Sequence, residues 1–184
     1  HRLVQLATRK WLERRMEIQR WQEEATNVLS REFPSGEYEN WGTCETLSPH
    51  AREVLRCKPV SDEHLLARGS LLHNMAWYGW LQGRYAVVRE QIQESLAIRE
   101  RLLENSHKSI SYSVELLGLI LDAQGKYAEA EAMNRRALAG RETALGLEHP
   151  DTLISVYCLA YLLRILKRHN EALVLYNTAC NGFK

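Results

Sequence analysis

A segment of this chain repeats itself 42 residues later, and this fixed spacing restricts the fold more than any other feature. Residues 82–86 are QGRYA, and residues 124–128 are QGKYA. In the same register, residues 96–100 (LAIRE) return as residues 138–142 (LAGRE). A third copy is more diverged, but Glu129-Ala130 returns in it as Glu171-Ala172, His107 as His149 and Leu117 as Leu159. Self-similarity at a fixed offset predicts one supersecondary unit that is stacked on copies of itself.

The repeated unit is predicted to be helical. Only 4 prolines and 10 glycines punctuate the 184 residues. They fall between stretches that are rich in Ala, Leu, Glu, Gln and Arg, which are good helix formers. The alternation of apolar and polar residues that marks a half-buried strand is missing. We therefore expect an all-α chain, with helical pairs at residues 62–81 and 85–103, 109–123 and 127–145, and 151–165 and 169–180.

The composition argues against several classes of function. The chain is 45% apolar and 26% charged with a formal charge of +1, so no overall field attracts nucleic acid or an anionic membrane. No apolar run is long enough to span a bilayer. The four cysteines include no Cys-x-x-Cys pair, which suits a reducing compartment. We expect a cytoplasmic protein that binds neither nucleic acid nor membrane.

Small or compact side chains recur at matched places in the three copies, which predicts points of close helix approach. They occupy one position in the first helix of each pair and two positions in the second helix. These sets are Ala76, Gly118 and Ala160; Val88, Ala130 and Ala172; and Ser95, Ala137 and Ala179. The period alone fits HEAT and armadillo repeats, at about 40–47 residues, better than tetratricopeptide repeats, at about 34 residues. The small residues decide between these families.

Their arrangement resembles the tetratricopeptide signature. A large residue precedes a small one in the first helix, Gly-x-Tyr forms the turn in two copies, and two small residues follow in the second helix. The longer period and the linker at residues 145–153 (LGLEHPDTL) resemble the kinesin-light-chain type of this repeat. The resemblance covers residues 62–184. It implies a right-handed superhelix of helical hairpins, with repeats at residues 62–104, 105–146 and 147–184.

Residues 20–61 resemble a degenerate fourth hairpin followed by a connector. We expect one helix over residues 20–33, a turn at residues 35–38 and a second helix that ends near Arg56. Pro49 falls inside the second helix. A kink is therefore expected there, or a restart of the helix with Ser48 as its N-cap.

Residues 1–19 are predicted to form a helix that belongs to a neighbouring domain. The stretch HRLVQLA at residues 1–7 resembles the end of the winged-helix subdomain in NB-ARC signalling ATPases. His1 lines up with the histidine of that family's signature, and Arg2 replaces its aspartate. The junction resembles that of fungal NLR-like proteins, in which an NB-ARC module precedes a kinesin-light-chain-like array. This resemblance implies an upstream nucleotide-binding domain as a partner.

No catalytic, metal-binding or cofactor-binding residues are predicted. The cluster EHPD at residues 148–151 places an acid beside a base, but Pro150 and Asp151 are typical of the start of a helix. No His or Cys pair has the spacing of a zinc site, and the chain has no Gly-rich phosphate-binding loop. We therefore expect a non-enzymatic chain without a cofactor.

The first helix of each pair is expected to line a concave groove that binds a protein or peptide ligand. The resemblance to tetratricopeptide arrays places there a surface rich in Trp and Tyr, residues that are enriched at protein interfaces. The predicted groove residues are Ser70, His73, Asn74, Trp77, Trp80, Tyr112, Glu115, Leu119, Asp122, Tyr157, Cys158, Tyr161 and Arg164. The alternative is that Trp77, Trp80 and Tyr161 pack against the next repeat or the N-terminal helices.

By resemblance, the function is ligand sensing for an NLR-like signalling ATPase. The alternative is a cargo adaptor of the kinesin-light-chain kind, which normally has a coiled coil before its repeats. The residues before Asp62 show no sustained heptads, which disfavours the adaptor. The apolar face of a terminal repeat also predicts self-association through the repeat ends.

Overall fold

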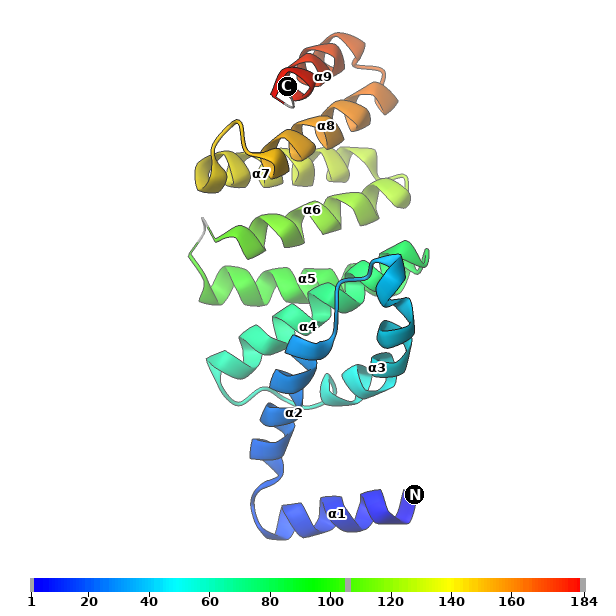
Figure 1. Ribbon diagram of the computed structural model, residues 1–184, viewed down its shortest axis with the longest axis vertical. Coiled ribbons are helices and arrows are strands. Elements are labelled where there is room, and N and C mark those ends of the chain that lie inside the picture. Colours follow the sequence, from blue (N-terminus) through cyan, green and yellow to red (C-terminus); the bar gives the residue numbers. More distant parts are fainter. Residues whose placement is uncertain (1, 105–106, 183–184) are drawn as a thin grey trace.

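The computed structural model of the protein describes residues 2–104 and 107–182. Every regular element within these residues is a helix, and most of the helices are stacked along the long axis of the molecule (Figure 1). The prediction of an all-α chain is confirmed. The elements are α1 (Arg2–Arg14), α2 (Ile18–Glu32), the 3₁₀ turn η1 (Tyr38–Asn40), α3 (Trp41–Val54), α4 (Asp62–Leu81), α5 (Tyr85–Leu102), α6 (Lys108–Ala123), α7 (Tyr127–Leu145), α8 (Pro150–Ile165) and α9 (His169–Gly182).

The helices from α4 to α9 form three hairpins, α4/α5, α6/α7 and α8/α9, whose partners share the most extensive contacts. Successive hairpins meet where α5 packs on α6 and α7 packs on α8. Figure 1 shows the resulting superhelical stack, as the sequence predicts. The bounds of these helices lie within two residues of the expected ones. The largest group of buried apolar side chains joins the first two hairpins and includes Ile92, Leu116 and Ile120.

The matched small residues are buried where the helices approach. Ala76, Ala130 and Ala160 have no exposed surface. A Cβ atom added to Gly118 on α6 would clash with Oδ1 of Asn134 on α7. Small side chains at these places therefore set how closely the two helices of a hairpin can pack.

At one matched position the first repeat has Val88 where the other two repeats have alanine, and the residue that faces Val88 on α4 is smaller than in the other repeats. In the second repeat Leu121 is paired with Ala130, and both are buried. In the first repeat the equivalent residues are Gly79 and Val88, and a Cβ atom on Gly79 would clash with Cγ1 of Val88. The third repeat has the same arrangement as the second, with Leu163 and Ala172. In each repeat, therefore, only one of the two helices carries the larger side chain at this contact, because a close-packed interior has no room for large side chains on both.

The turn inside each hairpin has the same backbone conformation in all three repeats. Its central residue adopts a positive φ, of 73° at Gly83, 72° at Gly125 and 62° at Lys167. In the second repeat the amide of Lys126 then donates to the carbonyl of Leu121 at 2.9 Å, which closes the helix end. Glycine adopts this conformation without strain. The third repeat keeps the turn although lysine has replaced glycine.

The helices α2 and α3 do not form a hairpin as tight as the other three. α2 makes its most extensive contacts with α4, and α3 packs on both α2 and α4 (Figure 1). The loop between them lies against α4, with Phe33 only 1% exposed. Asn74 on α4 donates from Nδ2 to the carbonyl of Phe33 at 2.8 Å. The N-terminal segment is therefore fixed to the first repeat by both apolar and polar contacts.

Of the two outcomes expected at Pro49, a kink or a restart of the helix at Ser48, the restart is wrong. α3 continues from Trp41 to Val54 through Pro49, and the Ser48 hydroxyl donates back to the carbonyl of Cys44 at 2.6 Å instead of capping a new helix. Proline removes only one helix hydrogen bond, to the carbonyl of Glu45. Glu45 is exposed, so water can bind that carbonyl. Packing of the buried side of α3, with Cys44 and Ala51 fully buried, holds the helix together.

The N-terminal helix α1 projects from the stack and contacts mainly α2 (Figure 1). Its apolar side chains Leu3 and Val4 are 81% and 67% exposed. A cleft of about 740 Å³ lies between α1, α2 and the residues after α3, and is lined in part by Leu12 and Trp21. His1, which the sequence resemblance aligns with a family signature, lies outside the described residues.

We expect the Gly79–Val88 contact to show strong energetic coupling. Val88→Ala alone should destabilise the chain by about 1–3 kcal/mol because it leaves a cavity. Gly79→Leu alone should cost about 1–3 kcal/mol because it overpacks the contact. The double variant reproduces the Leu–Ala pair of the second repeat, so its cost should be lower than the sum of the single costs by at least about 1 kcal/mol. Urea unfolding of the four proteins measures these differences, and additive costs would contradict the interpretation.

Candidate functional site

The first helices of the three hairpins, α4, α6 and α8, carry the residues predicted to line the groove. We call the exposed or half-buried side chains among them the groove surface. It is most open on α8, where Tyr157 is 52% and Tyr161 is 41% exposed. The guanidinium carbon of Arg164 lies 5.2 Å from the ring centroid of Tyr161, and Tyr157 contacts Tyr176 of α9 with ring centroids 5.4 Å apart. The α8 part therefore offers aromatic surface beside a cation.

The α4 part of the groove surface is mostly engaged in packing. Trp77 and Trp80 lie against the apolar group between the first two hairpins, with their ring centroids 5.7 Å apart. Asn74 is bonded to Phe33 of the α2–α3 loop. The two tryptophans therefore pack within the array, as the alternative interpretation expects. Tyr161 is 41% exposed, so its ring is less covered by neighbouring side chains than the two tryptophans are.

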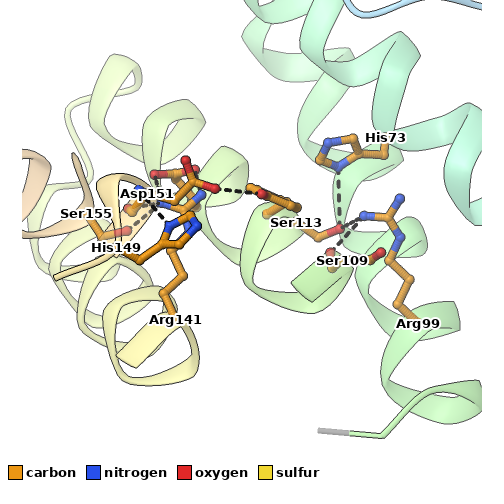
Figure 2. Close-up of polar contacts among 10 residues, drawn as sticks. His73, Arg99, Ser109, Ser113, Arg141, His149, Asp151 and Ser155 are labelled. Atoms are coloured by element: carbon orange, nitrogen blue, oxygen red, sulfur yellow. Dashed lines mark hydrogen bonds and ion pairs between the residues drawn. The ribbon is translucent and has the colours of Figure 1, made fainter. Parts of the chain in front are cut away.

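On α6, the groove residue Glu115 takes part in a buried ion pair with Arg141 of α7. Arg141 donates to Oε1 of Glu115 from Nη1 at 2.8 Å and to Oε2 from Nη2 at 2.5 Å. The side chains are 4% and 13% exposed. Arg141 also donates to the Ser155 hydroxyl on α8 at 2.6 Å and to the carbonyl of Asp151 at 2.9 Å (Figure 2). One arginine thus ties α7 to α6 and to the next hairpin.

Arg99, the equivalent residue of α5, forms a similar tie between the first and second hairpins. It donates from Nη1 to the Ser113 hydroxyl at 2.6 Å and to the carbonyl of Ser109 at 2.8 Å (Figure 2). Nδ1 of His73 lies 3.4 Å from the same hydroxyl. Burial lowers the pKa of Arg99 to about 10. Burial, assisted by the charge of Arg99, lowers the pKa of His73 to about 3, so this imidazole is neutral at physiological pH.

These two arginines were not predicted as site residues. Their recurrence at the 42-residue spacing could have drawn attention to them, because Arg99 and Arg141 lie within the repeated segments LAIRE and LAGRE. An arginine on a helix otherwise suggests a solvated face, and the sequence gives no sign that both guanidinium groups are buried. Their serine partners also recur at the same offset, as Ser113 and Ser155.

The EHPD cluster at residues 148–151 is the start of a helix, as predicted. His149 is the N-cap of α8, and its Nδ1 accepts from the amide of Asp151 at 3.1 Å. Tyr112 donates from its hydroxyl to the carboxylate of Asp151 at 2.8 Å, and this hydrogen bond is the main reason that the pKa of Tyr112 is raised. His107 caps α6 in the same way. Asp151 and His149 thus have structural partners.

Burial raises the pKa of two other ionisable groups of the groove surface. Burial, with a further contribution from Glu115, raises the pKa of the Cys158 thiol to about 11. Burial also raises the pKa of the Asp122 carboxyl. No cluster of three or more metal-ligating His, Cys, Asp or Glu side chains occurs among residues 2–104 and 107–182. Within the same residues, no helix is long and apolar enough to cross a bilayer.

Comparison with known families identifies the repeats. Two family models described as tetratricopeptide repeat match this chain, one at residues 69–107 and one at residues 109–184. Residues 69–107 and 109–184 are tetratricopeptide repeats. Tetratricopeptide repeats are protein-interaction modules, which agrees with the function expected from the groove.

One protein sequence and two solved structures are similar to this chain. The chain is 34% identical over 107 residues to a protein of Hyaloscypha variabilis named nucleotide-binding leucine-rich repeat (NLR)-like protein. The match covers 58% of this chain and only 11% of that relative. A crystal structure from Podosopora anserina contains nearly identical TPR-like repeats described as kinesin light chain. It is 18% identical to this chain with a TM-score of 0.56, and the superposition covers 97% of this chain and 94% of that chain. A single-residue variant of that structure gives the same TM-score. At this identity the likeness concerns the fold.

We predict that His73 makes the stability of the chain depend on pH. Its folded pKa of about 3 lies below the ordinary value of 6.5, so between these values the unfolded chain binds a proton that the folded chain does not. Stability from this residue is therefore complete above about pH 6.5 and is lost as the pH falls toward 3, by at most about 1.4 kcal/mol per pH unit. Between pH 7 and pH 5 the wild type should lose roughly 1–2 kcal/mol more than a His73→Gln variant in urea unfolding. Parallel pH profiles of the two proteins would exclude this role.

Proposed function

We propose that this chain is the ligand-sensing repeat region of an NLR-like signalling ATPase. The observation that carries the proposal is the 34% identity over 107 residues to the NLR-like protein of Hyaloscypha variabilis. In this proposal the chain is non-enzymatic and works in the cytoplasm. A protein or peptide ligand lies on the groove surface, and a nucleotide-binding domain precedes residue 1 in the complete protein.

The organisation of the chain supports this arrangement. We assign residues 1–19 to the end of a neighbouring winged-helix region, residues 20–61 to a degenerate hairpin with its connector, and residues 62–184 to three repeats. Leu3 and Val4 of α1 are mostly exposed, as expected for a helix that packs against another domain. The cleft between α1 and α2 lies beside them. The repeats then extend away from that contact (Figure 1).

Regulation in such a protein is a matter of linkage. A ligand shifts the balance between an inactive and an active state only if it binds the two states with different affinity. The groove surface meets this requirement if the upstream domain restricts access to it, or changes its curvature, in one of the states. The fixed contact between α2 and α4 would transmit such a change from the N-terminal helices to the first repeat.

A cargo adaptor is the second candidate function. Its support is the fold-level likeness to the kinesin-light-chain, TPR-like repeats, which covers 97% of this chain. The coding sequence upstream of residue 1 separates the two candidates. A Gly-x-x-x-x-Gly-Lys-Ser/Thr loop within the preceding few hundred residues supports the sensor. Sustained heptads there, without such a loop, would favour the adaptor.

The groove surface itself is tested at its most open part. Tyr161→Ala combined with Arg164→Ala removes an aromatic ring and a cation from α8, and should reduce ligand binding by at least about tenfold because such residues dominate interfaces. Tyr127→Ala is a matched control, since Tyr127 on α7 is 37% exposed and lies outside the groove residues. Quantitative mass spectrometry of proteins retained from fungal extract measures the effect.

The result expected is a set of retained proteins that is lost with the α8 variant and kept with the Tyr127 control. Circular dichroism of both variants confirms that the helices remain folded. If the α8 variant retains the same proteins in the same amounts as the wild type, ligands do not bind this part of the groove.

A further inference from the structure

A cavity of about 220 Å³ lies where α3 meets the turn end of the first hairpin. Its walls come from α3, α4 and the start of α5, and α3 packs on α4 (Figure 1). Two of its lining residues, Arg52 and Arg84, are cations, and none of the described residues that line it is acidic. The cavity shares no residue with the groove surface, so it is a separate place where the chain can bind a ligand.

Gly79 leaves space at this cavity, where the other two hairpins have leucine. The matching residue of the second repeat, Leu121, is buried. In the first repeat Val88 occupies part of that space, and Nε of Arg84 lies 4.0 Å from the point where a Cβ atom of residue 79 would be. The guanidinium carbon of Arg84 lies 5.3 Å from the ring centroid of Tyr78. The arginine therefore borders a space that exists only in the first repeat.

Arg84 also lacks the counter-ion that its equivalents have. In the other two repeats, the basic residue at this position pairs with a glutamate three residues later. These pairs are Lys126 with Glu129, at 3.9 Å, and Arg168 with Glu171, at 2.5 Å. In the first repeat the glutamate is replaced by Val87. Among the described residues, no carboxylate pairs with Arg84.

Arg52 brings a second cation to the cavity from α3. Its Nε donates to the carbonyl of Ser48, one turn earlier, at 3.3 Å. Within the part of the chain that the structure describes, Arg52 has no carboxylate partner either. Both arginine side chains are exposed, so a ligand at the mouth of the cavity can reach them. Two cations of one sign beside a low-dielectric wall attract anions.

The inner wall of the cavity is apolar. Met75, Tyr78 and Val88 contribute to it and are buried. The volume of about 220 Å³ is smaller than the roughly 300–1,000 Å³ of pockets for drug-sized ligands. It suits one anionic group together with the few carbon atoms that carry it.

The two guanidinium groups favour phosphate over carboxylate as that anionic group. A guanidinium fork matches the two oxygens of one carboxylate, so a carboxylate satisfies one arginine. A phosphomonoester has three terminal oxygens and a charge of about −1.5 to −2 at pH 7. It can therefore accept from two arginines at once and balance both charges.

We propose that this cavity is a phosphomonoester-binding site. Arg84 and Arg52 hold the phosphate, and the carbon atoms attached to it contact the apolar wall beside Gly79. The phosphate belongs either to a phosphorylated side chain or to a small phosphorylated molecule. Because one arginine belongs to α3 and the other precedes α5, the bound phosphate also joins α3 to the first hairpin.

The test uses phenyl phosphate as the probe and arginine side-chain NMR signals as the readout. The probe is titrated into the 184-residue chain at about pH 7.5, with sodium chloride replaced so that ionic strength stays constant. The Nε–Hε signals of Arg84 and Arg52 are expected to shift and to saturate, and the melting temperature to rise. Arg168 is the internal control, since Glu171 already binds it, and its signal should not shift.

Two variants of Val87 test the role of the missing counter-ion. Val87→Glu restores the glutamate of the other repeats, so it should weaken the binding of phenyl phosphate by at least about tenfold. Val87→Gln has a similar size without the charge and should bind as the wild type does. Val87 is 63% exposed, so both variants should keep the fold, which circular dichroism checks.

Two further variants test the second cation. Arg52→Gln should also weaken binding by at least about tenfold. Arg101→Gln changes the net charge by the same amount at a side chain that is 63% exposed and does not line the cavity. It should leave the binding of phenyl phosphate unchanged, because a distant exposed charge is screened by salt.

Three probes distinguish the sources of the phosphate. Inorganic phosphate has no carbon atoms, acetyl-Gly-pSer-Gly-amide presents a phosphorylated side chain, and phenyl phosphate presents a small ring. A saturable shift of Arg84 and Arg52 with any of them supports the site, and the probe that binds most tightly identifies the source. No saturable shift with any probe, an equal shift of Arg168, or undiminished binding in both Val87→Glu and Arg52→Gln would show that the two arginines are ordinary solvated side chains.

Discussion

The architecture depends on how closely the two helices of each hairpin can approach. A helix presents side chains on every turn, and two helices pack tightly only where small side chains face each other. Ala76 and Ala160 fulfil this requirement with no exposed surface. The Gly79–Val88 pair stands where the second repeat has a Leu–Ala pair, so the larger side chain can come from either helix as long as the residue that faces it is small.

Once the hairpins are formed, polar ties determine how they meet. Arg99 and Arg141 each join the second helix of one hairpin to the first helix of the next. Because both ends of these contacts are buried, they restrict the angle between neighbouring hairpins. That angle sets the curvature of the concave side. Residues such as Glu115 therefore belong both to the groove surface and to the tie that shapes it.

The groove surface is unevenly available for binding. Its α4 part is packed against the core and against the α2–α3 loop, while its α8 part exposes Tyr157, Tyr161 and Arg164. Asn74 illustrates the difference, since its amide is already bonded to the backbone of Phe33. The open aromatic part of the groove surface thus lies on α8, in the third repeat.

The sequence by itself determined the helical hairpins, their bounds and the small residues at their contacts. These features are local, or recur at one fixed offset, so periodicity and turn residues such as Gly83 and Gly125 are enough to predict them. Only the tertiary structure decided that Arg99 and Arg141 are buried, that Asn74 binds the preceding loop, and that α3 continues through Pro49. Each of these outcomes depends on which segment covers a side chain, and a helical pattern specifies the face of a residue but not the neighbour that removes it from water.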